Sequence, residues 1–133
     1  MSRVRVLIAD DHRLFAESLM VALSQDDRME VVGIAENGRD ALVLAQELQP
    51  DVVLLDVNMP LMSGVEALSE LRRRLPEARV IFLTGSERSA NLAGAQEAGA
   101  DAFLLKSVHT SELLDVILIA AAFARPAAAS ASA

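Results

Sequence analysis

The sequence predicts an α/β fold in which a parallel sheet carries helices on both faces. Short apolar runs alternate five times with stretches of helical periodicity, which is the pattern of repeated βαβ units. Most of the runs are continuously apolar, as expected of strands that are buried on both faces. The expected strands cover residues 4–9, 31–35, 52–55, 80–83 and 102–105.

Helices are expected between and after these strands. In the first, Phe15, Leu19 and Leu23 recur at the spacing of one helix face. Similar apolar stripes mark the second and third helices, whereas the fourth is weakly patterned. The expected helices cover residues 12–25, 39–48, 65–74, 88–98 and 111–124.

Composition limits the classes of protein that the chain can represent. Its 133 residues fit one domain, and 53% hydrophobic with 23% charged residues indicates a globular body. No apolar run approaches the roughly 20 residues that span a bilayer. Cysteine is absent, and the net charge of −7 repels nucleic-acid phosphates. We therefore expect a cytoplasmic domain that binds neither membrane nor nucleic acid directly.

The C-terminal residues differ in composition from the rest of the chain. The sequence RPAAASASA at 125–133 lacks a packing pattern, and Pro126 ends the last helix. We expect a domain over residues 1–124, followed by a linker or frayed tail.

Polar residues stand at the ends of four of the five expected strands. Asp10 and Asp11 follow the first strand, Asp56 the third, Thr84 the fourth and Lys106 the fifth. In an open α/β sheet, functional groups gather outside the carboxyl ends of the strands, near the point where strand order reverses. The sequence therefore predicts that these five residues surround one crevice.

The predicted crevice has a definite chemistry. Two carboxylates about 4 Å apart repel by roughly 4 kcal/mol at an effective dielectric near 20, so three of them must share protons or bind a cation. Oxygen ligands suit a hard ion such as Mg²⁺, which leaves room for a phosphoryl oxygen. Lys106 and Thr84 can contact other phosphoryl oxygens, while Asp56 is left to act as the nucleophile. Lys106 is expected to contribute little packing.

Four motifs with these residues resemble the receiver domain of bacterial two-component response regulators. They occur in order over residues 3 to about 124, and the Asp-Asp-His opening with the Lys-Ser ending is most similar to the NarL/FixJ (LuxR-type) subfamily. That resemblance implies a flavodoxin-like (βα)5 doubly wound sheet with strand order 2-1-3-4-5. The motifs are 8-IADDH-12, 51-DVVLLDVNMPLMSG-64, 81-IFLTG-85 and 99-GADAFLLKS-107.

The resemblance also implies a phosphoacceptor site. Asp56 would receive a phosphoryl group from a histidine kinase. Asp11 and Asp56 would bind Mg²⁺ together with the backbone carbonyl of Asn58, and Asp10 would act through a metal-bound water. The domain would not be a separate enzyme, because it would assist only its own phosphorylation and dephosphorylation.

A switch is the second implication of the resemblance. Lys106 would contact the phosphoryl group, Thr84 would move toward it, and Phe103 would turn inward to fill the vacated space. This is a population shift that alters a partner-binding surface. Subfamily members usually carry a DNA-binding output domain, which we expect to lie outside this chain. Ser107 replaces the proline that often follows the lysine, so a trans peptide bond is expected there.

Several alternatives compete with this hypothesis. The chain could be a stand-alone phosphorelay receiver, or a receiver that binds partners without phosphorylation. A Mg²⁺-dependent phosphohydrolase would also use an aspartyl phosphate, but it would offer an acid where Asn58 stands. A nucleotide or flavin binder would need a glycine- or hydroxyl-rich loop after the first strand, where Asp10 and Asp11 stand instead.

Simpler structural explanations exist for individual residues. Asp10 and Asp11 could cap the following helix, and Phe103 could be ordinary core packing. His12 and His109 lack a supporting motif, so neither is expected to take part in catalysis. The arginines at 72–74 suit the negative end of a helix dipole.

The last expected helix is apolar almost all round. Its inward stripe would comprise Leu113, Val116, Ile117 and Ala120. That arrangement leaves Leu114, Leu118 and Ile119 toward the outer side, where only Asp115 interrupts them. We expect this outer face to meet a second copy of the chain or an output domain.

Overall fold

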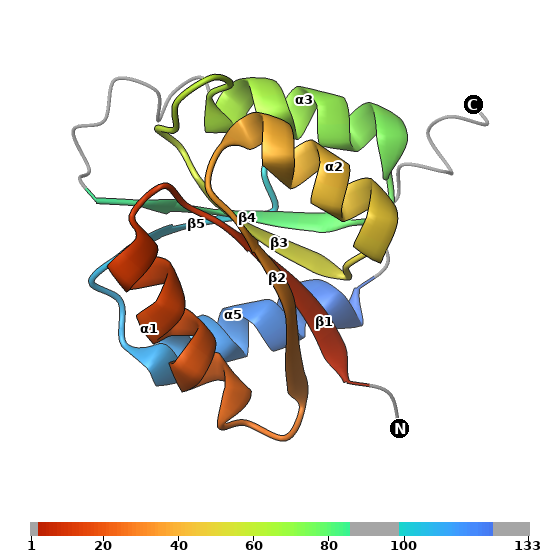
Figure 1. Ribbon diagram of the computed structural model, residues 1–133. Helices are drawn as coiled ribbons and strands as arrows, with labels where there is room; N and C mark the ends of the chain where they lie inside the picture. The colour runs from red at the N-terminus through yellow and green to blue at the C-terminus, as the bar shows by residue number, and fades with distance from the viewer. Residues whose placement is uncertain (1–2, 86–98, 124–133) are drawn as a thin grey trace.

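A computed structural model of the chain describes residues 3–85 and 99–123, which form an α/β fold (Figure 1). The helix expected over 88–98 and the tail at 125–133 lie outside the described residues. Within the described residues the elements are β1 (Val4–Ala9), α1 (Arg13–Ser24), β2 (Met29–Ala35), α2 (Gly38–Leu48), β3 (Val52–Asp56), α3 (Gly64–Arg74), β4 (Arg79–Thr84), β5 (Ala102–Leu105) and α5 (Thr110–Ala122).

All five strands belong to one parallel sheet. Their order is β2-β1-β3-β4-β5, which confirms the predicted topology. The chain runs outward from β1 to β2 and then returns past β1 to β3, so the order reverses between β1 and β3. Figure 1 shows α2 and α3 on one face of the sheet and α1 and α5 on the other.

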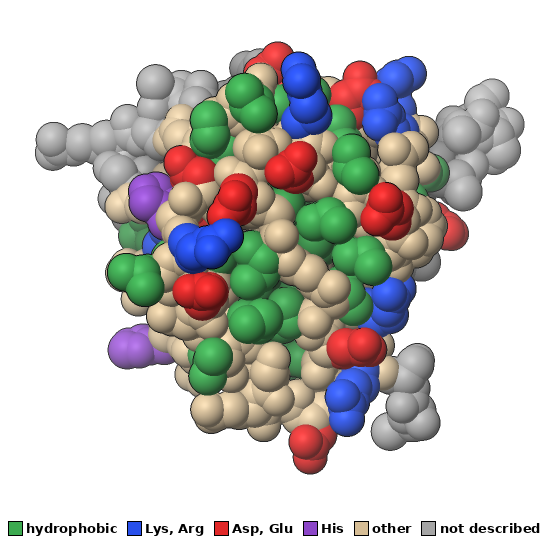
Figure 2. Space-filling view, in the orientation of Figure 1, with side chains coloured by type: hydrophobic (Ala, Val, Ile, Leu, Met, Phe, Trp, Pro, Cys, Tyr) green, Lys and Arg blue, Asp and Glu red, His purple; other side chains and the backbone are tan. Residues whose placement is uncertain are grey.

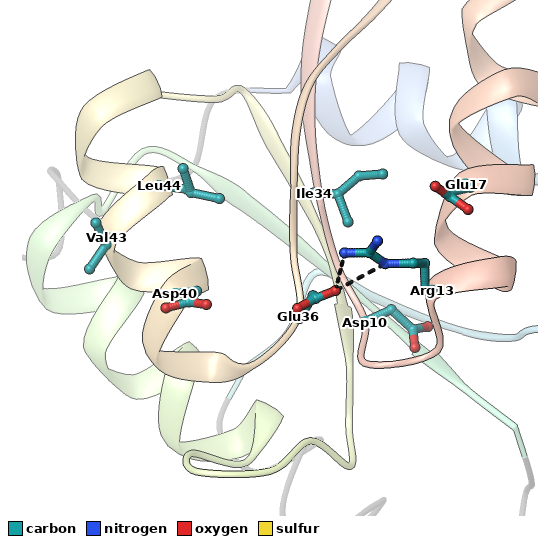
Figure 3. Close-up of a pocket in the computed structure, with 8 residues that line it drawn as sticks. All are labelled: Asp10, Arg13, Glu17, Ile34, Glu36, Asp40, Val43 and Leu44. Atoms are coloured by element: carbon teal, nitrogen blue, oxygen red, sulfur yellow. Dashed lines mark hydrogen bonds and ion pairs between the residues drawn. The ribbon is translucent and has the colours of Figure 1, made fainter.

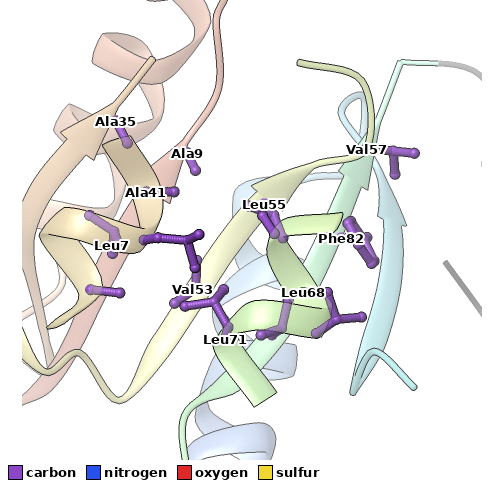
Figure 4. Close-up of a cluster of buried hydrophobic side chains, with 14 residues drawn as sticks. Leu7, Ala9, Ala35, Ala41, Val53, Leu55, Val57, Leu68, Leu71 and Phe82 are labelled. Atoms are coloured by element: carbon purple, nitrogen blue, oxygen red, sulfur yellow. The ribbon is translucent and has the colours of Figure 1, made fainter. Parts of the chain in front are cut away.

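The face of the sheet under α2 and α3 forms the first of two cores. Leu7, Val53, Leu55 and Phe82 project from the strands toward these helices, and each is fully buried (Figure 4). We call this cluster the α2–α3 core. Its remaining buried members are Ala9, Ala35, Ala41, Leu42, Ala45, Val57, Ala67, Leu68, Leu71 and Val80.

The opposite face of the sheet forms the α1–α5 core. Because strand side chains alternate between faces, the neighbours of the first set point to the second. Thus Leu54 lies in the α1–α5 core between Val53 and Leu55, which lie in the other. The buried members of the α1–α5 core are Val6, Ile8, Ala16, Leu19, Leu23, Met29, Val52, Leu54, Ile81, Leu83, Leu113 and Ile117.

Three strands are longer than their apolar runs predicted, and one of them, β3, is longer by the single residue Asp56. β2 begins at Met29, whose backbone pairs with Val4 and whose side chain is buried. β4 begins at Arg79, which pairs with Val52, and it ends at Thr84. Backbone pairing with a neighbouring strand, rather than side-chain polarity, decides these ends.

Helix α5 buries a narrower stripe than its composition predicted. Leu113 and Ile117 are buried as expected, and Ile119 is exposed as expected. The other members of the two predicted faces are all half-buried and pack against the α1–α5 core. They are Val116 and Ala120 from the inner set and Leu114 and Leu118 from the outer set.

Local signals fix the start of α3, which follows the end of β3. Ser63 caps the helix by accepting a hydrogen bond from the Glu66 backbone N–H, and the Glu66 carboxylate accepts one from the Ser63 N–H. This reciprocal capping box satisfies two donors at the helix N-terminus. At the other end, the three arginines at 72–74 lie in the last turn, as predicted.

Candidate functional site

The carboxyl edge of the sheet gathers the polar residues that the sequence singled out. Asp10 follows β1, and its N–H donates to the carbonyl of Ala35 at the end of β2. Asp56 is the last residue of β3 and Thr84 the last of β4. Lys106 follows β5 and donates its N–H to the Thr84 carbonyl at 2.8 Å. Sheet hydrogen bonding therefore holds these positions at one edge of the sheet, as predicted.

Three carboxylates meet there in what we call the acidic site, formed by Asp10, Asp11 and Asp56. One ligand atom from each, with one from His12, lies within 4.8 Å of all the others. Asp10 is 2% exposed and Asp56 4% exposed, whereas Asp11 faces solvent. The predicted convergence of the three acids is therefore present in the structure.

Burial of these acids changes the acidity of Asp56. Its removal from water and the charge of Asp10 raise the pKa of Asp56 to about 6, and the nearby Lys106 opposes that rise. The Asn58 backbone N–H donates to Asp56 Oδ1 at 3.2 Å, which also favours the ionised form. At neutral pH Asp56 is mostly ionised, and the site therefore requires compensating positive charge.

Lys106 supplies part of that charge. Its Nζ lies 2.7 Å from Asp10 Oδ2 and 3.4 Å from Asp56 Oδ2. The ammonium also sits over the Phe15 ring, 4.8 Å from its centroid, and the side chain is only 15% exposed. The prediction that Lys106 contributes little packing was wrong, because the long aliphatic stem is buried on its way to the acids.

His12 was excluded by the sequence reasoning, but the structure places it in the site. Its Nδ1 lies 3.1 Å from Asp10 Oδ1, 3.3 Å from Asp11 Oδ1 and 3.9 Å from Asp56 Oδ2. The same nitrogen is 3.1 Å from Lys106 Nζ. Its position in the sequence could have predicted this placement, because His12 directly follows Asp10 and Asp11 and lies at the same strand end.

The capping explanation for the two acids does not match the structure. The N-cap of α1 is His12, which makes no side-chain capping bond, and the first turn of α1 contains no acid. Asp10 Oδ1 instead accepts a hydrogen bond from the His12 N–H at 2.8 Å, a local turn that directs the carboxylate toward the site.

Thr84 and Phe103 lie farther along the sheet. Thr84 is 4% exposed. Phe103 pairs with Phe82 across β4 and β5, and the two rings stack with centroids 5.7 Å apart. Phe103 is half-buried against the α2–α3 core, so it packs as a core residue in this conformation. The Lys106–Ser107 peptide is trans, as expected, because the described residues contain no cis bond.

A groove of about 500 Å³ adjoins the acidic site between α1 and α2. Figure 3 shows Arg13 of α1 pointing toward Glu36, and 2.7 Å separates Arg13 Nη2 from Glu36 Oε1. Asp10 lies at the same end of the groove. Figure 2 shows acidic, basic and hydrophobic side chains interspersed on this face, without a continuous field of one sign.

Comparisons with known proteins agree with this geometry. The family model described as "Response regulator receiver domain" matches residues 6–118. The chain therefore belongs to the response regulator receiver domain family.

Curated relatives place the chain among regulators. It is 32% identical over 120 residues to the transcriptional regulatory protein DegU of Brevibacillus brevis, covering 90% of this chain and 51% of that protein. It is 35% identical over 114 residues to the response regulator protein VraR of Staphylococcus epidermidis, covering 86% and 54% respectively. The chain spans about half the length of the curated relatives it matches.

Solved structures confirm the fold and the subfamily. The receiver domain of the putative response regulator NarL from Mycobacterium tuberculosis superposes with a TM-score of 0.84 at 38% identity, covering 91% of this chain and 98% of that one. A LuxR-family DNA-binding response regulator from Staphylococcus aureus gives 0.83 at 30% identity, covering 89% and 98%. None of the helices in the described part of the chain has the length and apolar character needed to cross a membrane.

Proposed function

We propose that this domain is a phosphorylation-controlled switch in which Asp56 accepts a phosphoryl group from a histidine kinase. The observation that carries the proposal is the convergence of Asp56, two further acids and Lys106 at the carboxyl edge of one sheet. A nucleophilic carboxylate needs to be ionised, and with a pKa of about 6 Asp56 is mostly so at neutral pH.

The transfer step follows from these positions. An Asp56 oxygen attacks the phosphorus of the kinase phosphohistidine, the new P–O bond forms as the P–N bond breaks, and the leaving electron pair returns to the kinase imidazole. Lys106 already lies 3.4 Å from Asp56 Oδ2, so its ammonium can neutralise a phosphoryl oxygen bound there. Thr84 would contribute its hydroxyl to another phosphoryl oxygen.

The residues of the acidic site fit Mg²⁺. Their carboxylate oxygens are the hard donors that this ion prefers, and Asp10 Oδ2 is buried without an aligned hydrogen bond from the described residues. Asp11, Asp56 and the Asn58 backbone carbonyl would hold the ion, with Asp10 acting through water. When bound, Mg²⁺ would neutralise negative charge on the phosphoryl group.

The proposed output is a change in partner binding through Thr84 and Phe103. Phe103 stacks on Phe82 in the described conformation, and a movement of Thr84 toward a phosphoryl group would leave space for the Phe103 ring. The regulators DegU and VraR extend well beyond the matched region, which supports an assignment of residues 1–124 as the regulatory domain of a DNA-binding transcriptional regulator. Residues 125–133 would then form the linker.

The outer face of α5 is the proposed contact for a second copy or an output domain. Ile119 is 59% exposed on this face, and Phe123, the residue that follows the helix, is 69% exposed. Light scattering of the pure domain over a range of concentrations tests self-association. A strict monomer throughout would eliminate the second-copy version and leave the output domain.

A direct experiment tests the phosphoacceptor assignment. The domain is incubated with Mg²⁺ and a small phosphodonor, and intact mass is measured for wild type, Asp56→Asn and the control Asp51→Asn. We expect one added phosphate on wild type and Asp51→Asn and none on Asp56→Asn. Labelling of Asp56→Asn to the wild-type level would show that another residue accepts the phosphoryl group.

A further inference from the structure

The imidazole of His12 occupies a position that the function proposed above does not use. Its Nδ1 is 3.1, 3.3 and 3.9 Å from one oxygen each of Asp10, Asp11 and Asp56. A divalent ion about 2.0–2.2 Å from its ligands has neighbouring ligand atoms roughly 3.0–3.4 Å apart. The spacing of Nδ1 from Asp10 and Asp11 therefore equals the spacing of atoms that share one metal ion.

The contacts of this nitrogen are compatible with a bare Nδ1. In that form it accepts a hydrogen bond from the Lys106 ammonium, which is 3.1 Å away. The same ammonium lies 2.7 Å from the buried Asp10 Oδ2, so one cationic group already contacts both the imidazole and this carboxylate. A bare Nδ1 beside Asp10 and Asp11 can share a metal ion with their oxygens.

Local structure leaves the His12 ring available as a ligand. His12 is the N-cap of α1, but its side chain makes no capping bond, so the helix does not depend on it. The side chain is 67% exposed, so in the tautomer with the proton on Nε2 this N–H can donate a hydrogen bond to solvent. Neutral imidazole with one bare nitrogen is the form that binds metals.

We propose that His12 Nδ1 is a metal ligand, which adapts the acidic site to a first-row transition ion such as Mn²⁺, Co²⁺ or Zn²⁺ in preference to Mg²⁺. Imidazole nitrogen binds these ions well, and their affinity for mixed nitrogen and oxygen ligands rises along the series from Mn²⁺. Mg²⁺ favours oxygen donors and retains its waters, so a nitrogen ligand benefits it little. The inference rests on the proposed function only in taking the acidic site to be the divalent-ion site.

Metal binding is measured directly, so the test does not depend on phosphorylation. Co²⁺ and Mg²⁺ are each titrated by calorimetry into wild type, His12→Phe and His109→Phe, and the visible absorption of bound Co²⁺ is recorded in parallel. His109 is the matched control, because it is an exposed histidine at the N-cap of α5 that also makes no capping bond. Circular dichroism checks that each variant is folded.

We expect selectivity for Co²⁺ over Mg²⁺ to be lost in His12→Phe alone. In His12→Phe the ratio of Co²⁺ to Mg²⁺ affinity should fall by about 10- to 100-fold, with a changed Co²⁺ spectrum, because a nitrogen ligand is lost. His109→Phe should match wild type. An unchanged ratio in a folded His12→Phe would overturn the inference, as would a ratio that falls equally in His109→Phe.

The phosphoacceptor role of Asp56 and the metal-ligand role of His12 can be refuted independently. Phosphorylation of Asp56 is tested on wild type with Mg²⁺, so its failure would leave a His12-dependent Co²⁺ site intact. Conversely, a normal phosphorylation result with an unchanged Co²⁺ to Mg²⁺ ratio in His12→Phe would remove only the ligand role of His12.

Discussion

The carboxylate of Asp56 is held in the folded domain at an electrostatic cost. Because its pKa is raised to about 6 in the folded domain, the folded state holds its proton at pH values where the unfolded chain has released it. The free energy of unfolding contributed by this group is therefore highest below about pH 4 and is lost as the pH rises toward 6.

The first prediction compares Asp56→Asn with wild type as a function of pH without divalent ions. Between about pH 4 and pH 7, the free energy of unfolding of wild type should fall by about 1–2 kcal/mol relative to that of the variant, after allowance for solvent screening. Urea unfolding followed by circular dichroism measures the difference, and Asp27→Asn controls for loss of an exposed charge. A wild type that gains stability relative to Asp56→Asn over this range would contradict the sign of the shift.

The Lys106 ammonium offsets part of the electrostatic cost of burying the acids. The second prediction is that Lys106→Met, which keeps most of the packing on Phe15, lowers the free energy of unfolding by about 3 kcal/mol at pH 7, since a buried acid loses its partner. Asp10→Asn should lower it less, because the amide carries no charge. Unfolding of both single variants and the double variant forms a cycle, and additive effects would show that the two side chains do not interact.

His12 shows the limit of residue-level reasoning from sequence. The strand pattern determined which residues stand at the carboxyl edge, so Asp10, Asp11, Asp56 and Lys106 were all placed correctly. The direction of the His12 ring depends on the backbone turn after Asp10 and on the N-cap conformation of α1. That turn has no apolar periodicity, which is the signal on which the other assignments depended.

At the scale of elements, the connection between β3 and α3 fixes the phosphoacceptor end of the sheet. A Cβ placed on Gly64 would lie 2.3 Å from the Asp56 carbonyl oxygen and 2.8 Å from a Phe82 ring carbon. The first turn of α3 thus packs directly on the strand end that carries Asp56. This close approach requires glycine.

The third prediction follows from that approach. Gly64→Ala should destabilise the domain by about 1–3 kcal/mol, because backbone and a buried ring must move to admit the methyl group. Gly85→Ala is the matched control, since nothing lies within 4 Å of a Cβ there. Thermal unfolding measures both variants. Equal melting temperatures would show that the start of α3 accommodates the methyl group without loss of stability.

Element boundaries show where sequence patterns are sufficient and where they are not. Helices α2 and α3 begin within one residue of their predicted starts, where Asn37 and Ser63 cap them. The start of β2 at Met29 was missed because Glu30 interrupts the apolar run, although backbone pairing continues through it. The half-buried outer positions of α5 were missed because helix periodicity does not reveal how far neighbouring elements wrap around a helix.

At the scale of the whole molecule, one central sheet divides the apolar interior into two cores. The parallel sheet and its helix layers followed from five strand–helix repeats, whereas the strand order followed from the resemblance to receiver domains. The position of the site at the carboxyl edge followed from the parallel sheet, whose strands all end at that edge. The stacking of Phe103 on Phe82 did not, since the sequence left core packing and a switch role equally open.

Neighbouring residues of β3 allow the two cores to be tested separately. Leu54 belongs to the α1–α5 core and Leu55 to the α2–α3 core, and both are almost fully buried. The fourth prediction is that Leu54→Ala and Leu55→Ala each lower the free energy of unfolding by about 2–5 kcal/mol. Leu14→Ala, at a position that is 82% exposed, is the control and should change it little.

The shape of the transition tests whether the cores are coupled. Both cores are built on the same five strands, so neither can lose its packing while the sheet persists unless the helices on that face detach alone. We expect one urea transition in each variant, shifted to lower midpoint with an unchanged slope, by circular dichroism. Two transitions in Leu54→Ala would mean that α1 and α5 separate from the sheet first, and that the acidic site next to α1 can open while the α2–α3 core remains folded.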